Sequence, residues 1–98
     1  MDSLAHLENH LILCDAVYDC LLKENSHLRQ TQTPPDSAVL DAKAQLIESL
    51  KASINGLKSI HKTSPSEKTL VEKAQQKTLK IFHLLRENEQ LIFKIKNS

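Results

Sequence analysis

A row of residues at alternating steps of three and four, near the C-terminal end, constrains this chain more than any other feature. The row consists of Val71, Ala74, Thr78, Ile81, Leu85, Asn88, Ile92 and Ile95. This spacing places all of them on one face of an α-helix. A second row runs beside the first and consists of Leu70, Lys77, Leu84 and Leu91. A stripe this wide predicts a helix that packs between two others.

Local signals define where this helix begins. Ser64 offers an N-cap hydroxyl, Pro65 suits the first helical position, and Glu67 follows the cap by three residues. We therefore expect a helix over residues 65–96, which would measure about 48 Å at 1.5 Å per residue. Helices that pack along its whole length should also be long.

Two further rows with the same spacing predict two further helices. The first row is Leu4, Leu7, Leu11, Cys14, Tyr18, Leu21, Asn25 and Leu28, and it predicts a helix over residues 3–30. The second row is Leu40, Lys43, Ile47, Leu50, Ile54, Leu57 and His61, and it predicts a helix over residues 34–62. Thr33 is the expected cap of that helix, with Pro34 at its first position. Gly56 should allow a bend or a close approach of another helix.

The composition leaves helix as the only plausible class, because the 98 residues include one glycine and three prolines and almost no β-rich runs. The length suits a single domain over residues 1–98. Both expected connections are short, and short connections between long helices force antiparallel neighbours. The prediction is an all-α fold of three long antiparallel helices, an up-down-up bundle with coiled-coil-like packing.

Charge is distributed unevenly along the chain. Residues 1–33 carry two basic and five acidic side chains (net −3), residues 34–64 four and three (+1), and residues 65–98 seven and four (+3). Opposite signs favour the first and last helices lying side by side, although solvated charges contribute little and are screened by salt. The total of +1 argues against nucleic acid as the main partner.

The sequence indicates a cytoplasmic protein. No apolar run approaches the length of a membrane span, so no membrane insertion is expected. Residues 1–13 lack the basic start and the cleavage region of a secretion signal. Cys14 and Cys20 are six residues apart on one helix and point about 240° apart, so they cannot be bridged. Both are expected to be reduced, which agrees with this compartment.

A metal site and an enzyme are both disfavoured. His6, His10 and Cys14 follow each other at steps of four and could offer two nitrogens and a sulfur to zinc. However, no Glu follows the first histidine directly, as the metalloprotease signature requires, so we expect exposed histidines beside a core cysteine. The sequence has no phosphate-binding glycine loop and no nucleophile with a positioned base. No metal or cofactor is expected, and a small helical enzyme is a distant alternative.

Four polar residues interrupt the apolar rows: Asn25, Lys43, Thr78 and Asn88. A polar residue in such a seam lowers stability while it fixes the register or the number of partners. We predict that these four set the register of the bundle by pairing with one another or by reaching water. The functional alternative is a loosened core that opens or exchanges partners.

Phe82 and Phe93 stand out from the core pattern of the last helix. They are eleven residues apart and project within about 20° of each other, roughly 90 to 110° from the middle of the core stripe. Either they fold over the edge of the bundle, or they remain exposed as an apolar ladder of the kind that binds a partner. The predicted partner-binding residues are Phe82, Leu84, Glu89, Leu91 and Phe93.

Three segments carry a resemblance to a known family: Leu21-Leu22-Lys23-Glu24 followed by Leu28, then Leu40 to Leu50, then Leu84 to Ile92. They place a glutamate near the end of the first helix, a lysine before a leucine-rich run in the second, and an asparagine before paired aliphatic residues in the third. In this order, residues 21–92 resemble the flagellar export chaperones of the FlgN class, a bacterial type III secretion family.

The resemblance implies a small cytoplasmic protein that binds late, hook-junction or related axial subunits. Such chaperones keep the subunits from assembling early and deliver them to the export apparatus. Members usually extend beyond the third helix with a mobile tail involved in partner binding, whereas this sequence stops at Ser98. The leading hypothesis is a non-catalytic export chaperone or adaptor that docks helix to helix with a secreted axial or filament subunit. The alternatives are a chaperone of another type III system and a self-assembling structural bundle in which the apolar shoulders meet in a homodimer.

Overall fold

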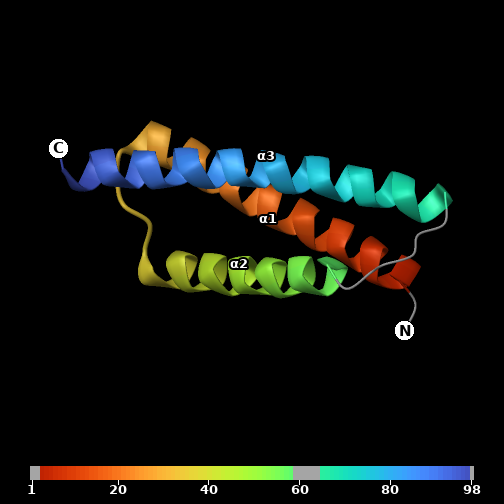
Figure 1. Ribbon diagram of the computed structural model, residues 1–98. Coiled ribbons are helices and arrows are strands. Elements are labelled where there is room, and N and C mark those ends of the chain that lie inside the picture. The colour runs from red at the N-terminus through yellow and green to blue at the C-terminus, as the bar shows by residue number, and fades with distance from the viewer. Residues whose placement is uncertain (1–2, 59–64, 98) are drawn as a thin grey trace.

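The computed structural model describes residues 3–58 and 65–97, and these residues form three helices (Figure 1). Helix α1 spans Ser3–Thr31, α2 spans Ser37–Lys58 and α3 spans Pro65–Lys96. Helices α1 and α3 run in the same direction and α2 runs against them (Figure 1). The bundle is elongated, with principal extents of 50 × 21 × 17 Å. The predicted all-α, up-down-up bundle is therefore confirmed.

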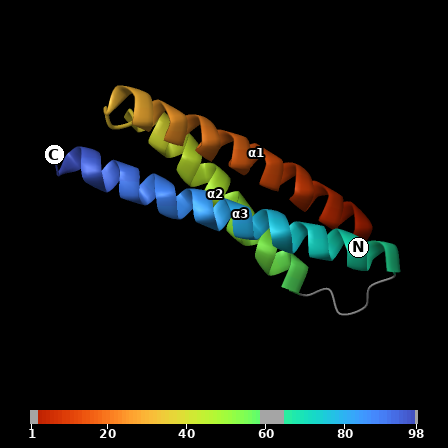
Figure 2. The same cartoon turned by 90° about the horizontal axis from the view of Figure 1, so that it is seen from above.

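Helix α1 packs against both of the others (Figure 2). Among the described residues, no α-carbon of α2 lies within 8 Å of an α-carbon of α3. Helix α1 therefore lies between the other two, the position expected for the last helix, and α3 reaches α2 through side chains, as in the 2.9 Å hydrogen bond from Lys43 to Asn88. The reason is that α1 buries two adjacent rows, Leu7, Cys14, Leu21 and Leu28 in one and His10, Val17 and Glu24 in the next. One row can face α3 while the other faces α2.

The core lies where all three helices meet. Its buried cluster consists of Cys14, Val17 and Leu21 from α1, Leu50 from α2 and Ile81 from α3. Leu50 is the only residue of α2 that is buried among the described residues, whereas α1 buries residues along its whole length. Burying a leucine stabilises the fold by about 1.5 to 3 kcal/mol. Packing therefore holds α2 to the bundle less firmly than it holds α1 and α3 to each other.

The start of α2 differs from the expectation. The carboxylate of Asp36 accepts a hydrogen bond from the backbone N–H of Val39 at 2.9 Å, so Asp36 is the N-cap and the helix begins at Ser37. Thr33, the expected cap, instead shares a 2.8 Å hydrogen bond with the hydroxyl of Thr31. The cause is the pair of prolines, because a residue that precedes proline avoids helical geometry and Pro34 precedes Pro35. The expected end of this helix at residue 62, His61 and the Ser64 cap lie outside the described residues.

The other helix ends lie close to the expected positions. Helix α3 has the predicted bounds, and α1 ends one residue later than expected, at Thr31. Gln32 then adopts a left-handed conformation with φ of 55°, and its N–H donates to the carbonyl of Leu28 at 3.0 Å. Its side-chain amide donates to the carbonyl of Arg29 at 3.0 Å. Gln32 therefore closes the helix in the position that glycine usually takes.

Ion pairs link the two parallel helices, as the charge distribution suggested. Lys77 of α3 pairs with Asp15 of α1 at 2.5 Å, and Arg29 of α1 pairs with Glu87 of α3. The second pair has the opposite polarity to the first, so the net charges of the two helices do not describe it. Because these side chains are between 31 and 64 % exposed, each pair contributes at most about 1 kcal/mol.

Candidate functional site

The first candidate feature is a polar cluster in the bundle interior, which we call the charged cluster: Glu24 and Asn25 of α1, Lys43 of α2 and Asn88 of α3. The ammonium group of Lys43 donates to the carboxylate of Glu24 at 3.2 Å and to the amide oxygen of Asn88 at 2.9 Å. The amide nitrogen of Asn88 donates to Asn25 Oδ1 at 2.9 Å and also to Glu24. The amide nitrogen of Asn25 donates to the backbone carbonyl of Leu84 at 3.2 Å. The cluster therefore connects all three helices.

The residues of the charged cluster are largely shielded from solvent, so their polar groups need partners within the protein. Glu24, Asn25 and Asn88 are all buried, and the side chain of Lys43 is only 13 % exposed. One carboxylate oxygen, Glu24 Oε1, has no hydrogen-bond partner among the described residues. Lys43 is the only cation bonded to this carboxylate in the described part of the chain. The structure thus brings together three of the four predicted register residues and adds Glu24, which the sequence analysis named only in the family resemblance and did not expect in the core.

Thr78, the fourth of those residues, belongs to a different group, which we call the histidine cluster: His10, Cys14, Ser53 and Thr78. His10 Nδ1 lies 2.7 Å from Ser53 Oγ, and His10 Nε2 lies 3.4 Å from Cys14 Sγ. The sulfur lies 4.0 Å from the hydroxyl of Thr78, which donates to the carbonyl of Ala74 on its own helix at 2.8 Å. This cluster also connects the three helices, without an ion pair.

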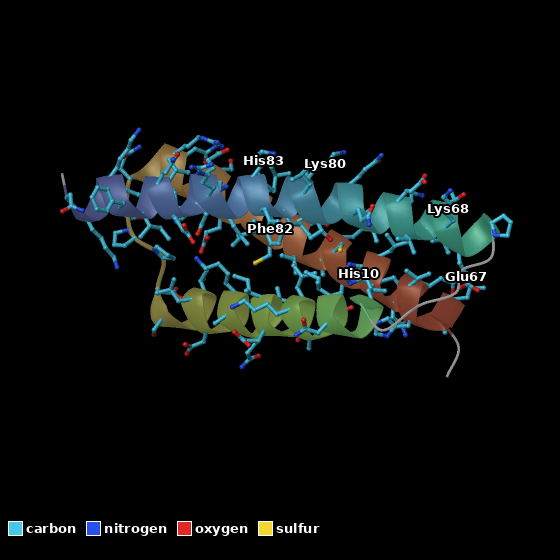
Figure 3. The ribbon with its side chains drawn as sticks, viewed as in Figure 1. His10, Glu67, Lys68, Lys80, Phe82 and His83 are labelled. Atoms are coloured by element: carbon cyan, nitrogen blue, oxygen red, sulfur yellow. The ribbon has the colours of Figure 1, made fainter. Side chains whose placement is uncertain are left out.

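The histidines are less exposed than expected. His10 is 1 % exposed, because Ser53 of α2 and Cys14 enclose its ring, and Figure 3 shows it between α1 and α2. Burial, helped by the nearby His6, lowers the pKa of His10 below its ordinary value of 6.5. His6 is half-buried, and its Nε2 lies 3.3 Å from the carbonyl of Ser53. A Cβ on Gly56 would lie 2.7 Å from the same nitrogen, so Gly56 permits the close approach that was predicted there.

Within the described residues, the histidines and cysteines are not arranged to bind a metal ion, and neither thiol has a lowered pKa. No group of three histidine, cysteine or acidic residues is placed to hold a metal ion in ranges 3–58 and 65–97. Cys14 and Cys20 are both free thiols. Burial raises the pKa of each thiol, which lowers the fraction of reactive thiolate.

The second candidate feature is a surface of α3 that we call the aromatic stripe: Leu79, Phe82, Arg86, Glu89 and Phe93. These residues follow each other at steps of three and four, and about 120° separates them from the buried row of Ala74, Ile81 and Asn88. Leu79 is 58 % exposed, Phe82 51 % and Phe93 67 %. Figure 3 shows Phe82 on the edge of α3 nearer α2, with Lys80 and His83 on the opposite edge. Both phenylalanines therefore form an exposed ladder.

The remaining predicted partner residues are divided between two faces of α3. Glu89 is exposed and lies on the aromatic stripe. Leu84 packs against the core cluster and Leu91 is half-buried. These two leucines are about 160° around the helix from Phe82 and Phe93, so the five residues do not form one surface. Sequence reasoning missed Leu79, although its position three residues before Phe82 is a signal that it shares the phenylalanine face.

Other exposed apolar residues are scattered. Ile12 is 67 % exposed on the side of α1 away from its buried rows, and Leu22, Val39 and Leu40 are each about two-fifths exposed. Single apolar residues at a surface are normal. In the described part of the chain, no helix combines the length and the apolar character needed to cross a membrane.

Comparison with known proteins adds nothing to this geometry. No protein family matches this chain, and neither a curated protein nor a solved structure was found to be similar to it.

Proposed function

We propose that this protein is a non-catalytic chaperone or adaptor that binds an amphipathic helix of a protein client. The observation that carries the proposal is the aromatic stripe, where three large apolar side chains of α3 remain more than half exposed. Aromatic residues contribute much of the energy at protein interfaces, and aligned residues on a long helix suit a helical partner.

The dimensions of the stripe support a helix as the bound element. Leu79 and Phe93 are fourteen residues apart on α3, which corresponds to about 21 Å along the axis. A client helix of four turns, with apolar residues at steps of three and four, would cover this length. The charged residues Arg86 and Glu89 lie between the phenylalanines and offer both signs of charge to such a partner.

The resemblance to the FlgN class supplies the proposed biological setting. In this setting the protein is cytoplasmic, the client is a secreted axial or filament subunit, and the export apparatus receives the complex. Subunits that assemble through helices carry apolar helix faces before assembly. Covering such a face with α3 would prevent premature assembly, and no catalytic step is required.

A paired substitution tests the docking surface. We expect the double variant Phe82→Ser with Phe93→Ser to lose its client in pull-downs from the source cells, with helical content unchanged by circular dichroism. The matched control is Ile12→Ser, because Ile12 is as exposed as Phe93 but lies on α1. Unchanged capture by the double variant would contradict the docking surface. Identification of the captured client as something other than a secreted, helix-containing subunit would contradict the export role.

A self-assembling structural bundle is the second candidate, and the same exposed side chains favour it. The two candidates differ in what happens when a client is present. A chaperone exchanges self-contacts for client contacts, so light scattering should show a one-to-one complex of chaperone and client. A structural subunit should keep its self-assembled mass under the same conditions.

A further inference from the structure

The aromatic stripe has a sequence that is complementary to itself. Its residues read Leu79, Phe82, Arg86, Glu89 and Phe93, and Lys96 continues the same spacing by three more residues. Two identical helices can pack through such a stripe in parallel or antiparallel orientation. The charges in the middle of the stripe distinguish the two orientations.

A parallel pair is unfavourable. Equivalent residues then lie opposite each other, so Arg86 faces Arg86 of the second copy and Glu89 faces Glu89 of the second copy. Like charges held directly opposite one another across an interface are destabilising. The two phenylalanines would stack in register, but both charged layers would repel.

An antiparallel pair joins every residue to a complementary one. With the two-fold axis between residues 87 and 88, Phe82 faces Phe93 of the second copy and Arg86 faces Glu89 of the second copy. Symmetry repeats each pair, which gives two aromatic layers outside two ion-paired layers. Leu79 meets Lys96 of the second copy, whose alkyl stem can cover it.

The side chains needed for this pairing are available. Leu79, Phe82 and Phe93 are more than half exposed, and Arg86 and Glu89 are exposed. Neither Arg86 nor Glu89 has an ion-pair partner within residues 3–58 and 65–97.

We propose that two copies of this chain form an antiparallel dimer through the aromatic stripe of α3, with Arg86 of each copy paired to Glu89 of the other. The overlap covers residues 79–96, about 27 Å of helix. Because a two-fold contact uses the same surface on both copies, it closes on itself and gives a dimer without open-ended polymers.

This inference goes beyond the proposed function, since it requires no client. The two are related through the surface that they share. A second copy covers the phenylalanines when client is absent, and a client helix must displace it. Client binding and dimerisation are therefore competitive.

A charge exchange tests the pairing in the purified full chain. We expect sedimentation equilibrium of the wild type to show a concentration-dependent rise from the mass of one chain to that of two. Arg86→Glu alone, and Glu89→Arg alone, should each weaken dimerisation roughly tenfold or more, because each places like charges together. Combining Arg86→Glu with Glu89→Arg should restore the dimer, since the exchanged pairs again attract. A double variant that dimerises no better than the single variants would overturn the proposal.

Cross-linking tests the orientation in a Cys20→Ser background, where the remaining Cys14 is buried. One preparation carries Arg86→Cys, and the other carries Glu89→Cys. With a short bismaleimide, a mixture of the two should cross-link in higher yield than either preparation alone, because residues 86 and 89 face each other only in the antiparallel pair. Ile12→Cys, at an exposed position on α1, should give no cross-link. Equal or higher yield from the separate preparations would overturn the antiparallel arrangement.

The two proposals fail in different experiments. A wild-type chain that stays monomeric at all concentrations would contradict the proposed dimer, but it would not contradict client capture. A dimer that persists with client bound would contradict the competition between client and second copy. A dimer that captures no client would contradict the chaperone role. Neither result would contradict the antiparallel pairing.

Discussion

The charged cluster and the histidine cluster perform the same structural task by different means. Each joins α1, α2 and α3 through polar side chains, and each contains a buried α1 residue that bonds to α2. In the charged cluster that residue is Glu24, which depends on the ammonium group of Lys43. In the histidine cluster it is His10, a ring that remains neutral and needs only a hydroxyl. A buried charge depends on one specific partner, whereas a neutral ring tolerates modest change.

The charged cluster and the histidine cluster contact α2 near its opposite ends. Lys43 lies six residues after the start of α2 and Ser53 lies five residues before its end. Between them, Leu50 is the one residue of α2 that is buried in the described chain. Each end of this helix is therefore fixed to α1 by a polar contact. The end fixed by the ion pair should respond to loss of charge, and the end fixed by His10 should respond to acid.

The largest expected effect comes from removing the cation of the charged cluster. Lys43→Met leaves the carboxylate of Glu24 buried without a counter-charge, so the free energy of unfolding should fall by about 3 kcal/mol. Urea unfolding at neutral pH measures this loss. Lys51→Met is the matched control, because Lys51 is exposed and, among the residues that the structure describes, pairs only with Glu48 at 3.5 Å. Its effect should stay within about 0.5 kcal/mol. Adding Glu24→Met to Lys43→Met should recover stability, and its failure to do so would contradict the ion-pair account.

A smaller effect is expected from acid acting on the histidine cluster. The pKa of His10 is lowered in the folded protein, so between that pKa and 6.5 the unfolded chain binds more protons than the folded one. Stability should therefore decrease as pH falls below about 6.5. In His10→Gln this part of the pH dependence should disappear. His83→Gln, at an exposed position on α3, should keep the wild-type slope, and equal slopes in all three proteins would refute the role of His10.

The smallest effect is expected at Thr78. Its hydroxyl bonds to the carbonyl of Ala74 within α3, and its contact with Cys14 is a weak one at 4.0 Å. Thr78→Val keeps the shape of the side chain, and the carbonyl of Ala74 keeps its place in the backbone of α3. The free energy of unfolding should therefore change by about 0.5 kcal/mol or less. A loss as large as that of Lys43→Met would show that Thr78 fixes the register after all.

Much of the fold could be predicted because helical periodicity depends on residues that are near one another in the sequence. The rows of apolar residues gave three helices, and the bounds of α3 agreed with the prediction. The same rows predicted that Asn25, Lys43 and Asn88 point inward. The angle of Phe82 and Phe93 to the core placed them at its shoulder, but it did not decide whether they are exposed. The start of α2 was misplaced because Thr33, before the prolines, was taken as the cap, although Pro34 precedes a second proline and avoids helical geometry, so that Asp36 caps the helix instead.

Other features depend on which helices touch. Glu24 resembles any surface glutamate in the sequence, yet it is buried because Lys43 and Asn88 reach it from two other helices. His10 was expected to be exposed, and the approach of α2 at Ser53 buries it. Leu84 and Leu91 were grouped with the phenylalanines, although the helix turns them toward the opposite side. A sequence row shows that a residue shares a face, but it does not show which neighbour covers that face.

By itself, the sequence determined three amphipathic helices, their directions and the polar residues in their seams, because hydrophobic spacing and short connections act between residues that are near one another along the chain. Only the tertiary structure decided that α1 is the shared partner, that two separate polar clusters form, and that Phe82 and Phe93 remain uncovered. Those outcomes depend on distances between residues that are far apart in the chain, and burial and electrostatic pairing are properties of such distances.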